Sequence, residues 1–245
     1  MVILAGCGRL AFDEPSADAA KADAAILDAL VDGPVPRPFL VQAVTASGTN
    51  SAVLLVGLNL PVTAGSMLVV TTLNFNVGGV AASTIDVSDD AGDVFTSTNA
   101  RAMWTGDDGQ VEIWYQPGAG GGATTVSIAS SGLTSRSAWL LELANMEPVQ
   151  PLDAVTVTND GITNGAPIAP TVNPTRPPAV IISAILLSGA VTQVTSGNGF
   201  VPLPLINGDA AAYAIVDTPG MYDAAWDAPG SDNFGSSTAA FLGAD

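Results

Sequence analysis

A continuous apolar run followed by a short acidic hairpin places the strongest constraint on this fold. Residues 66–74, Ser-Met-Leu-Val-Val-Thr-Thr-Leu-Asn, have the length and β-branched content of a buried strand and are too few for a membrane helix. The segment from Ile85 to Phe95 has two alternating arms around Asp-Asp-Ala-Gly, and its glycine can adopt the positive φ of a tight turn. A buried strand beside such a hairpin is typical of an antiparallel β-sandwich.

Short strand-like segments continue along the chain. The expected strands are 39–46, 52–60, 67–75, 83–88, 93–97, 110–116, 123–129, 136–144, 152–157, 179–187, 198–203, 210–217, 221–227 and 236–242. Turn residues separate most of them, which predicts an all-β, jelly-roll-like antiparallel β-sandwich. Residues 179–187 are apolar in both alternation phases, so we expect a central strand covered on both faces.

The Pro-, Asn- and Thr-rich stretch 145–178 leaves two interpretations open. It is either a long crossover between two sheets or a boundary between two small sandwiches. We expect a single domain over 39–245, because neither half alone contains a complete set of strands.

Charge and composition exclude several classes of function. The chain has 23 acidic and 6 basic residues, a net charge of −17, which opposes binding to the phosphates of nucleic acids. It contains no histidine, which removes Ser-His-Asp and Cys-His catalysis and nearly all zinc, copper and haem sites. We therefore expect a protein that is not an enzyme and has no cofactor, with Ca²⁺ as the one metal left open.

The first residues carry a short recognisable motif. Residues 4–7, Leu-Ala-Gly-Cys, resemble the lipobox of bacterial lipoproteins, in which a signal peptidase cuts before the cysteine and the new N-terminus is acylated. A charged n-region and most of the apolar h-region are missing, so either the start of translation lies upstream or the match is accidental. The resemblance implies that Cys7, the only cysteine, is a lipid anchor to a membrane. Gly8 after it implies the outer membrane.

The segment after the motif differs in composition from the rest of the chain. Residues 8–38 are rich in Ala, Asp and Pro and end in Pro-Val-Pro-Arg-Pro, which disfavours a helix. A short Ala-rich helix over 17–31 is the alternative, but isolated helices of this length are marginal in water. We expect residues 1–7 to be a truncated signal segment and residues 8–38 a flexible acidic tether to the domain at 39–245.

The layout of the folded part also resembles a known type of module. An apolar strand and acidic hairpin are followed by Gln110 to Tyr115, a Gly-rich turn and Thr125 to Ile128. Later come the segments Pro151 to Ala154, Ser196 to Phe200 and Pro219 to Trp226. Over about 39–243 this arrangement is similar to β-sandwich modules of secreted and surface-attached bacterial proteins. The resemblance implies the fold and a cell-envelope or extracellular location, and it implies no reaction.

One strand has an aromatic residue between polar neighbours. In the segment Gln110–Gln116, alternation places Glu112, Trp114 and Gln116 on one face. An aromatic ring beside hydrogen-bonding side chains is how sugar-binding surfaces are made, and Trp104, with Arg101 nearby, can join such a platform. The alternative is a tryptophan packed under a loop or a second layer. The other two tryptophans lie among apolar residues and are expected in the core: Trp139 and Trp226.

Four aspartates gather in the acidic hairpin: Asp86, Asp89, Asp90 and Asp93. Carboxylates in a turn can bind Ca²⁺. The spacing is not that of an EF-hand loop, and aspartate also forms turns through bonds to nearby backbone N–H groups. Both a solvated turn and a calcium site stay open. The pairs and groups at 107–108 and at Asp223, Asp227 and Asp232 allow the same two interpretations.

The sequence therefore predicts a non-catalytic surface or secreted bacterial lipoprotein whose β-sandwich binds a partner, in the first place a glycan. One alternative is a structural or adhesive envelope protein that self-associates. The other is a glycosidase that uses a carboxylate pair, with Glu112 and Glu142 as the candidates, because that chemistry needs no histidine.

Overall fold

A computed structural model of the chain describes residues 36–76, 83–104, 109–164, 166–195, 199–228 and 231–245. The strands in chain order are β1 (Phe39–Gly57), β2 (Met67–Asn76), β3 (Thr84–Asp89), β4 (Thr96–Ser97), β5 (Ala102–Trp104), β6 (Gly109–Gln116), β7 (Thr125–Ala144), β8 (Leu152–Asn164), β9 (Ala179–Leu187), β10 (Gln193–Thr195), β11 (Val201–Pro202), β12 (Ala210–Val216), β13 (Ala225–Asp227) and β14 (Ser231–Leu242). Within these ranges, no helix has the length and apolar character needed to cross a membrane.

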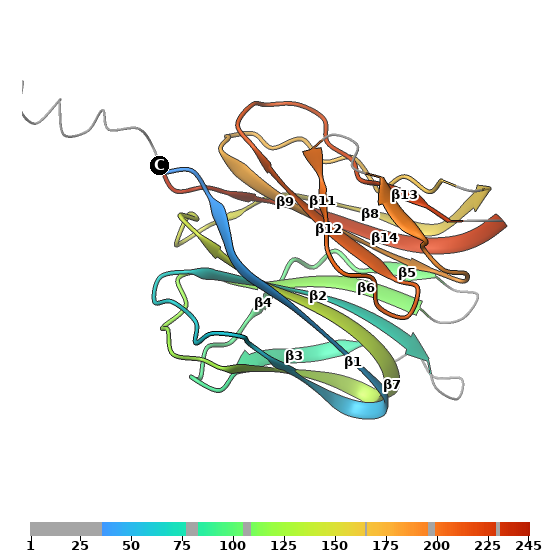
Figure 1. Cartoon of the computed structure of the whole chain (residues 1–245), viewed down its shortest axis with the longest axis horizontal. Helices are drawn as coiled ribbons and strands as arrows, with labels where there is room; N and C mark the ends of the chain where they lie inside the picture. Colours follow the sequence, from blue (N-terminus) through green and yellow to red (C-terminus); the bar gives the residue numbers. More distant parts are fainter. Residues whose placement is uncertain (1–35, 77–82, 105–108, 165, 196–198, 229–230) are drawn as a thin grey trace, which may run out of the picture. The chain divides into compact units, whose positions relative to one another are not determined.

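The strands form two main antiparallel sheets, which confirms the predicted β-sandwich (Figure 1). The first sheet has the order β1-β7-β2-β6-β4, with β3 also paired to β7 and β5 to β6. The second has the order β11-β12-β9-β14-β8, and β10 and β13 form a small separate pair. Every strand of the first sheet precedes residue 145, and every strand of the second follows residue 151.

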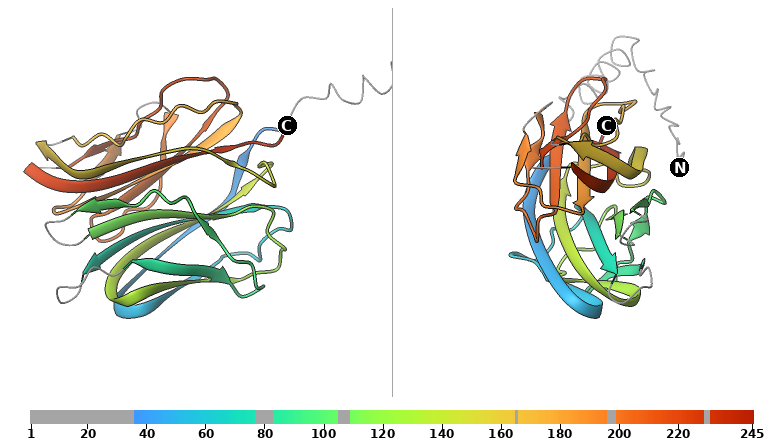
Figure 2. Two further views of the ribbon diagram at one scale, coloured as in Figure 1. Left: turned by 180° about the vertical axis from the view of Figure 1, so that it is seen from behind. Right: turned by 90° about the vertical axis from the view of Figure 1, so that its right-hand side faces the viewer.

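Two long strands give the first sheet a second layer. One half of β7 pairs with β2, and residues 126–130 of the other half pair with β3, while β1 follows β7 along both halves. The sheet therefore folds back beneath itself (Figure 2). A hydrophobic core fills the fold: side chains of β1, β3 and the first half of β7 pack against Leu68, Val70 and Leu140.

The main core lies between the two sheets. Side chains of β2, β6 and β7 pack there against β9, β12 and β14. All of residues 67–74 are buried, as the apolar run predicted. Every residue of β9 is buried as well, because a core lies on each of its faces, and Trp139 and Trp226 are core residues as expected.

The acidic hairpin forms with the expected turn. Ser88 pairs with Val94, and the Phe95 N–H donates to the Val87 carbonyl at 2.9 Å. Gly92 has φ of +95°, the left-handed conformation that the turn requires and that glycine adopts without a steric penalty.

The strand boundaries differ from expectation where turn residues are absorbed into a continuous strand. The segments expected as 39–46 and 52–60 are one strand, β1, and 123–129 and 136–144 are one strand, β7. In β1 the residues Gly48 to Val53 form bulges, with Asn50 at φ of +53°, so the chain bends without leaving the sheet. Two short strands, β5 and β10, were not expected.

Residues 36–245 form one compact unit. The stretch 145–178 contains β8, an edge strand of the second sheet, and the core between the sheets takes side chains from both sides of this stretch. Arg37 pairs with Asp217 at 2.6 Å, so the folded unit includes the last residues of the expected tether. Residues 1–35, with the lipobox-like segment, Cys7 and the rest of the tether, lie outside the described residues.

Candidate functional site

The candidate site lies on the face of β6 that points away from the core between the sheets. Val111, Ile113 and Tyr115 face that core. The residues between them, Glu112 and Trp114, face the inside of the folded first sheet. There, Trp114 packs against the hydrophobic core that fills the fold of this sheet. This is the alternation expected from the sequence.

A bulge in the neighbouring edge strand makes room for a pocket. Ser97 of β4 pairs with Trp114, and Ala102 of β5 pairs with Val111. Between these pairs, residues 98–101 therefore face only residues 112–113. The extra residues bend the chain away from β6, a device that is common beside functional sites.

Asn99, within the bulge, helps to hold this shape. Its φ is +60°, a conformation that asparagine tolerates better than most residues. Its backbone N–H donates to the Ser97 hydroxyl at 3.0 Å. This local hydrogen bond to a side chain stabilises the bulge.

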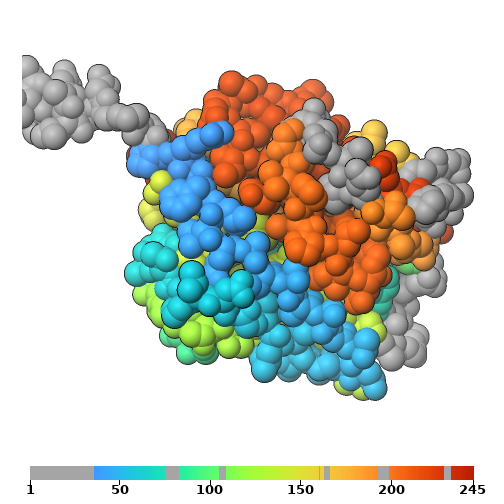
Figure 3. Space-filling view, in the orientation of Figure 1, coloured from blue at the N-terminus to red at the C-terminus, as the bar shows by residue number. Residues whose placement is uncertain are grey.

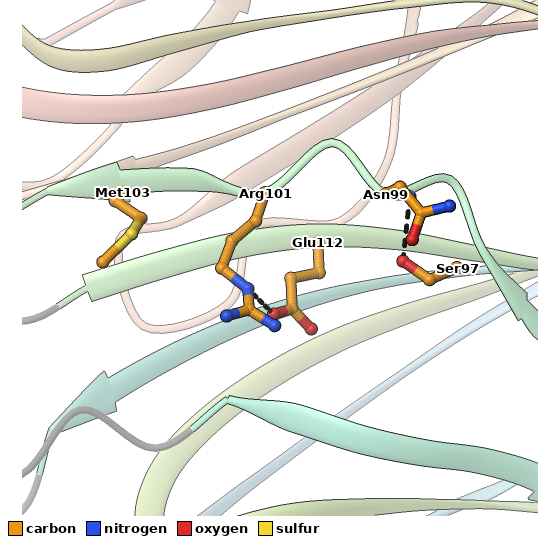
Figure 4. Close-up of a pocket in the computed structure, with 5 residues that line it drawn as sticks. All are labelled: Ser97, Asn99, Arg101, Met103 and Glu112. Atoms are coloured by element: carbon orange, nitrogen blue, oxygen red, sulfur yellow. Dashed lines mark hydrogen bonds and ion pairs between the residues drawn. The ribbon is translucent and has the colours of Figure 1, made fainter.

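The pocket has a volume of about 370 Å³ and is lined by Ser97, Asn99, Arg101, Met103 and Glu112 (Figure 4). The first four alternate along the edge strand, and Glu112 lies across from them on β6. The guanidinium of Arg101 forms an ion pair with the Glu112 carboxylate. The Arg101 side chain is 43% exposed, whereas the Glu112 side chain is 4% exposed.

The indole N–H of Trp114 donates to Oε2 of Glu112 at 3.3 Å. Glu112 is therefore held from two sides, by Arg101 through Oε1 and by Trp114 through Oε2. These contacts fix the orientation of a buried carboxylate at the base of the pocket.

A row of buried polar side chains continues behind the pocket. Arg136 of β7, Asn74 of β2 and Gln110 of β6 lie opposite one another across the three strands. Arg136 Nε donates to Asn74 Oδ1 at 2.6 Å, and its Nη1 donates to the Ile128 carbonyl at 2.6 Å. Arg136 Nη2 and Gln110 Oε1 are buried without a hydrogen-bond partner. Burial lowers the pKa of Arg136, and the charge of Glu112 opposes that shift.

The structure brings some of the predicted ligand-binding residues together and separates others. Glu112 lines the pocket, and the partly exposed Trp114 contacts it. Gln116 is two residues further along β6 and donates to the Pro117 carbonyl at 3.4 Å. Trp104 lies in β5 and is only 4% exposed, so its ring offers no face to a ligand here.

Glu112 and Glu142 do not form a catalytic carboxylate pair. Across the sheet, Glu112 is opposite Thr72 and Glu142 is opposite Leu68 of the same strand. Four residues of a strand span about 13 Å, more than the roughly 5 to 9.5 Å that separates the carboxylates of glycosidases. The register of the sheet therefore argues against Glu112 and Glu142 as the carboxylate pair of a glycosidase.

Glu142 is instead committed to the structure. Its Oε1 accepts hydrogen bonds from the Thr63 N–H at 2.8 Å and the Ser66 hydroxyl at 3.0 Å, and its Oε2 accepts from Gln42 Nε2 at 2.7 Å. Burial raises the pKa of Glu142, but these hydrogen bonds together outweigh it and leave the pKa below its ordinary value. The Glu142 carboxylate of β7 therefore holds the loop before β2 next to β1.

In the acidic hairpin, three of the four carboxylates accept hydrogen bonds from backbone N–H groups, and Asp89 and Asp90 each accept two hydrogen bonds or more. Asp89 Oδ1 accepts from the N–H groups of Ala91 and Asp93 at 3.0 and 2.9 Å, which closes the turn. Asp90 accepts from the N–H and hydroxyl of Thr124 at 2.8 and 2.7 Å. The hydroxyl bond is the main cause that lowers the pKa of Asp90.

The other two aspartates of the hairpin also have protein partners. Asp93 accepts from the Gly120 N–H at 2.8 Å, and Asp86 accepts from the Ser88 hydroxyl at 3.3 Å. Across the described residues, no three acidic side chains come together in an arrangement that could hold a metal ion. These contacts favour the turn over the calcium site as the role of the cluster.

Sequence reasoning did not single out Ser97, Asn99 and Met103, and it named Arg101 only as a neighbour of Trp104. These residues alternate along an edge strand whose register is broken by a bulge. Only the pairing with β6 shows that break.

Comparison of the chain with protein-family models, curated proteins and solved structures returns no match.

Proposed function

We propose that residues 36–245 are a non-catalytic binding module that holds a saccharide in the pocket between the β4–β5 edge and β6. The observation that carries this proposal is the pocket itself. About 370 Å³ is at the lower end of the size range of small-molecule sites, and one guanidinium, one carboxylate, one amide and one hydroxyl converge on it.

The chemistry of the pocket suits a hydroxylated ligand. Glu112 accepts hydrogen bonds, Arg101 donates them, and the side chains of Asn99 and Ser97 can do both. Met103 supplies an adaptable apolar surface for the faces of a sugar ring. Donors and acceptors beside an apolar surface are what a saccharide requires, because it carries hydroxyls at its edge and C–H groups on its faces.

The number of carboxylates at the pocket favours a binding role over a catalytic one. Among the described residues that line the pocket, Glu112 is the one acidic side chain, and it is already held by Arg101 and Trp114. Hydrolysis of a glycoside needs a second carboxylate within reach of the first. Glu142 does not meet this requirement.

The sequence motif at 4–7 extends the proposal to the location of the protein. We propose that an acyl group on Cys7 anchors the chain to the outer membrane and that the acidic tether displays the module in the cell envelope or outside the cell. Labelled fatty acid should be incorporated by cells that produce the protein, and the Cys7→Ala variant should lose the label. Label that persists in the variant would remove the anchor from Cys7.

Binding is tested with the full chain on an array of neutral and acidic glycans, followed by calorimetric titration of the sugars that bind. The variant Asn99→Gly removes the amide and retains access to the positive φ of the bulge. We expect it to weaken binding at least tenfold. The matched control is Asn207→Gly, which makes the same change at an exposed asparagine with φ of +53° in another turn.

Equal loss of affinity in both glycine variants, or binding unaffected by Asn99→Gly, would remove the ligand from this pocket. If no glycan binds, the saccharide proposal fails.

Self-association is a second candidate function, and a specific edge of the sheet favours it. β1 lies at the edge of the first sheet, and its 19 residues include no charged residue and no proline. Edge strands usually carry such residues because unpaired backbone groups bind other chains. Val53 and Leu55 are 47% and 63% exposed beside this edge, and Figure 3 shows β1 at the surface.

The occupant we propose for this edge is β1 of a second copy, because an uncharged strand is where two chains of net charge −17 can approach with least repulsion. Sedimentation of the full chain should show a dimer, and Leu55→Lys should shift it to monomer. Ile162→Lys, which changes a 74% exposed residue of the edge strand β8, is the matched control. A monomer in the unaltered protein would refute this candidate.

A further inference from the structure

The arginines of the folded unit fall into two kinds of environment. The described residues contain four of them: Arg37, Arg101, Arg136 and Arg176. Arg37 pairs with the exposed Asp217 at 2.6 Å, and Arg176 pairs with Glu147 at 3.8 Å and with Asp245. Of the other two, Arg101 pairs with Glu112, and the charge of Glu112 favours the charged form of Arg136.

Arg101 contacts the Glu112 carboxylate, whereas Arg136 feels its charge without a hydrogen bond or ion pair to it. The Oε1 atom of Glu112 is in the ion pair with Arg101, and its Oε2 atom accepts from Trp114. Arg136 is 2% exposed, and both of its hydrogen bonds go to neutral oxygen atoms, on Asn74 and Ile128. Its Nη2 atom has no partner.

These three groups together have a charge opposite in sign to that of the whole chain. Arg101 and Arg136 with Glu112 sum to +1, in a protein of net charge −17. A buried cation with an incomplete counter-charge is costly, and an added anion nearby reduces that cost.

We propose, on the basis of the binding function above, that the ligand of this pocket is a carboxylate-bearing saccharide of the hexuronate class. Its carboxylate binds the exposed part of the Arg101 guanidinium. Glu112 then becomes a fuller counter-charge for Arg136, so that each guanidinium has an anion of its own. The sugar hydroxyls bind Asn99 and Ser97.

Arginine is suited to this role. Its planar guanidinium can bind two carboxylates at different edges, because five N–H donors point outwards in a fixed geometry. Figure 4 shows the Arg101 side chain reaching across the pocket, with Nε towards Glu112. Met103 lies on one side of the Arg101 side chain and Asn99 on the other. The ring of the sugar would lie beside these side chains.

The test compares acidic and neutral sugars that differ at one carbon. Glucuronate and galacturonate are titrated calorimetrically into the full chain, with glucose and galactose as their neutral counterparts. We expect each uronate to bind at least tenfold more tightly than its counterpart at 50 mM salt. The preference should fall at 500 mM salt, because the contact is between exposed charges.

Arg101→Gln should abolish the preference, because the uronates should lose more affinity than their neutral counterparts. Arg176→Gln, at an arginine of similar exposure (47% against 43%), is the matched control and should leave the preference intact. Circular dichroism checks the fold of both variants.

The outcomes separate this inference from the proposal on which it rests. Equal affinity for uronates and neutral sugars, or tighter binding of the neutral ones, would overturn the inference and leave the saccharide site standing. A uronate preference that survives in Arg101→Gln would also overturn it. Failure of all four sugars and of the glycan array would refute both.

Discussion

Replacing Asp209 with asparagine should stabilise the protein at neutral pH and leave it unchanged in acid. Asp209 ends the turn that precedes β12 and is 1% exposed, at the boundary between the two sheets. Within the described part of the chain, its carboxyl group accepts one hydrogen bond, from the Ser137 hydroxyl of β7 at 3.2 Å. Burial raises the pKa of Asp209 from 3.8 to about 8, and the hydrogen bond from Ser137 offsets little of this shift.

The size of the effect follows from that pKa. The unfolded chain loses the proton near pH 3.8, whereas the folded protein keeps it until about pH 8. Between these values the unfolded state binds fewer protons, so the free energy of unfolding falls as pH rises, by about 1.4 kcal/mol per pH unit. The total loss by pH 8 is on the order of 5 kcal/mol. The asparagine of the variant has no proton to lose and can still accept the bond from Ser137.

Guanidinium chloride unfolding of both proteins, followed by tryptophan fluorescence from pH 4 to 8.5, measures this difference. The two proteins should be equally stable near pH 4, and the variant should become progressively more stable above it. Ser137→Ala, which removes the donor that favours the charged carboxylate, should extend the loss of stability to higher pH. A stability difference between Asp209→Asn and the unaltered protein that is constant across this range would refute the reasoning.

Two further predictions concern the loops of the first sheet. Glu142→Gln puts an amide where Gln42 now donates to a carboxylate, so the free energy of unfolding should fall by about 1–3 kcal/mol above pH 5. The loss should shrink as the pH falls below 4.5, because the unfolded chain then binds a proton at Glu142 that the folded protein, with its lowered pKa, does not yet bind; a loss that persists unchanged at pH 3 would contradict this. Gly121→Ala should destabilise the protein by more than about 1 kcal/mol, because φ is +86° and the new Cβ lies 2.8 Å from the Ala64 nitrogen. Gly122→Ala, at the same φ with open space around it, isolates the strain, and denaturation showing equal losses would exclude the steric part.

Much of the architecture was predictable because alternation and turn chemistry are local properties. The run 66–74 and the residues of β9 are apolar enough to require burial, and the structure buries them. Gly92 marks a turn that only a residue free to take positive φ forms easily. The turn before β12 was also present in the sequence as Ile206-Asn207-Gly208-Asp209, with positive φ at its two central residues, although it was not among the expected turns.

The candidate site was predictable only in part. Alternation placed Glu112 and Trp114 on one face of a strand, because side chains in a strand point to opposite faces in turn. It did not place Trp104, whose burial depends on the second sheet packing over β5, or Arg101, whose position depends on a bulge opposite β6.

The sequence by itself determined that the chain forms strands, which of their faces are apolar, and which chemistries lack the residues they need. Only the tertiary structure decided that β1 and β7 each serve two layers, that Asp209 is enclosed between the sheets, and that Arg101 pairs with Glu112 while Arg136 is buried without an ion pair. The physical reason is that local patterns specify the direction of a side chain relative to its own strand. Its burial and its electrostatic partners depend on the register and on the layer that covers it, and both arise from residues far away in the chain.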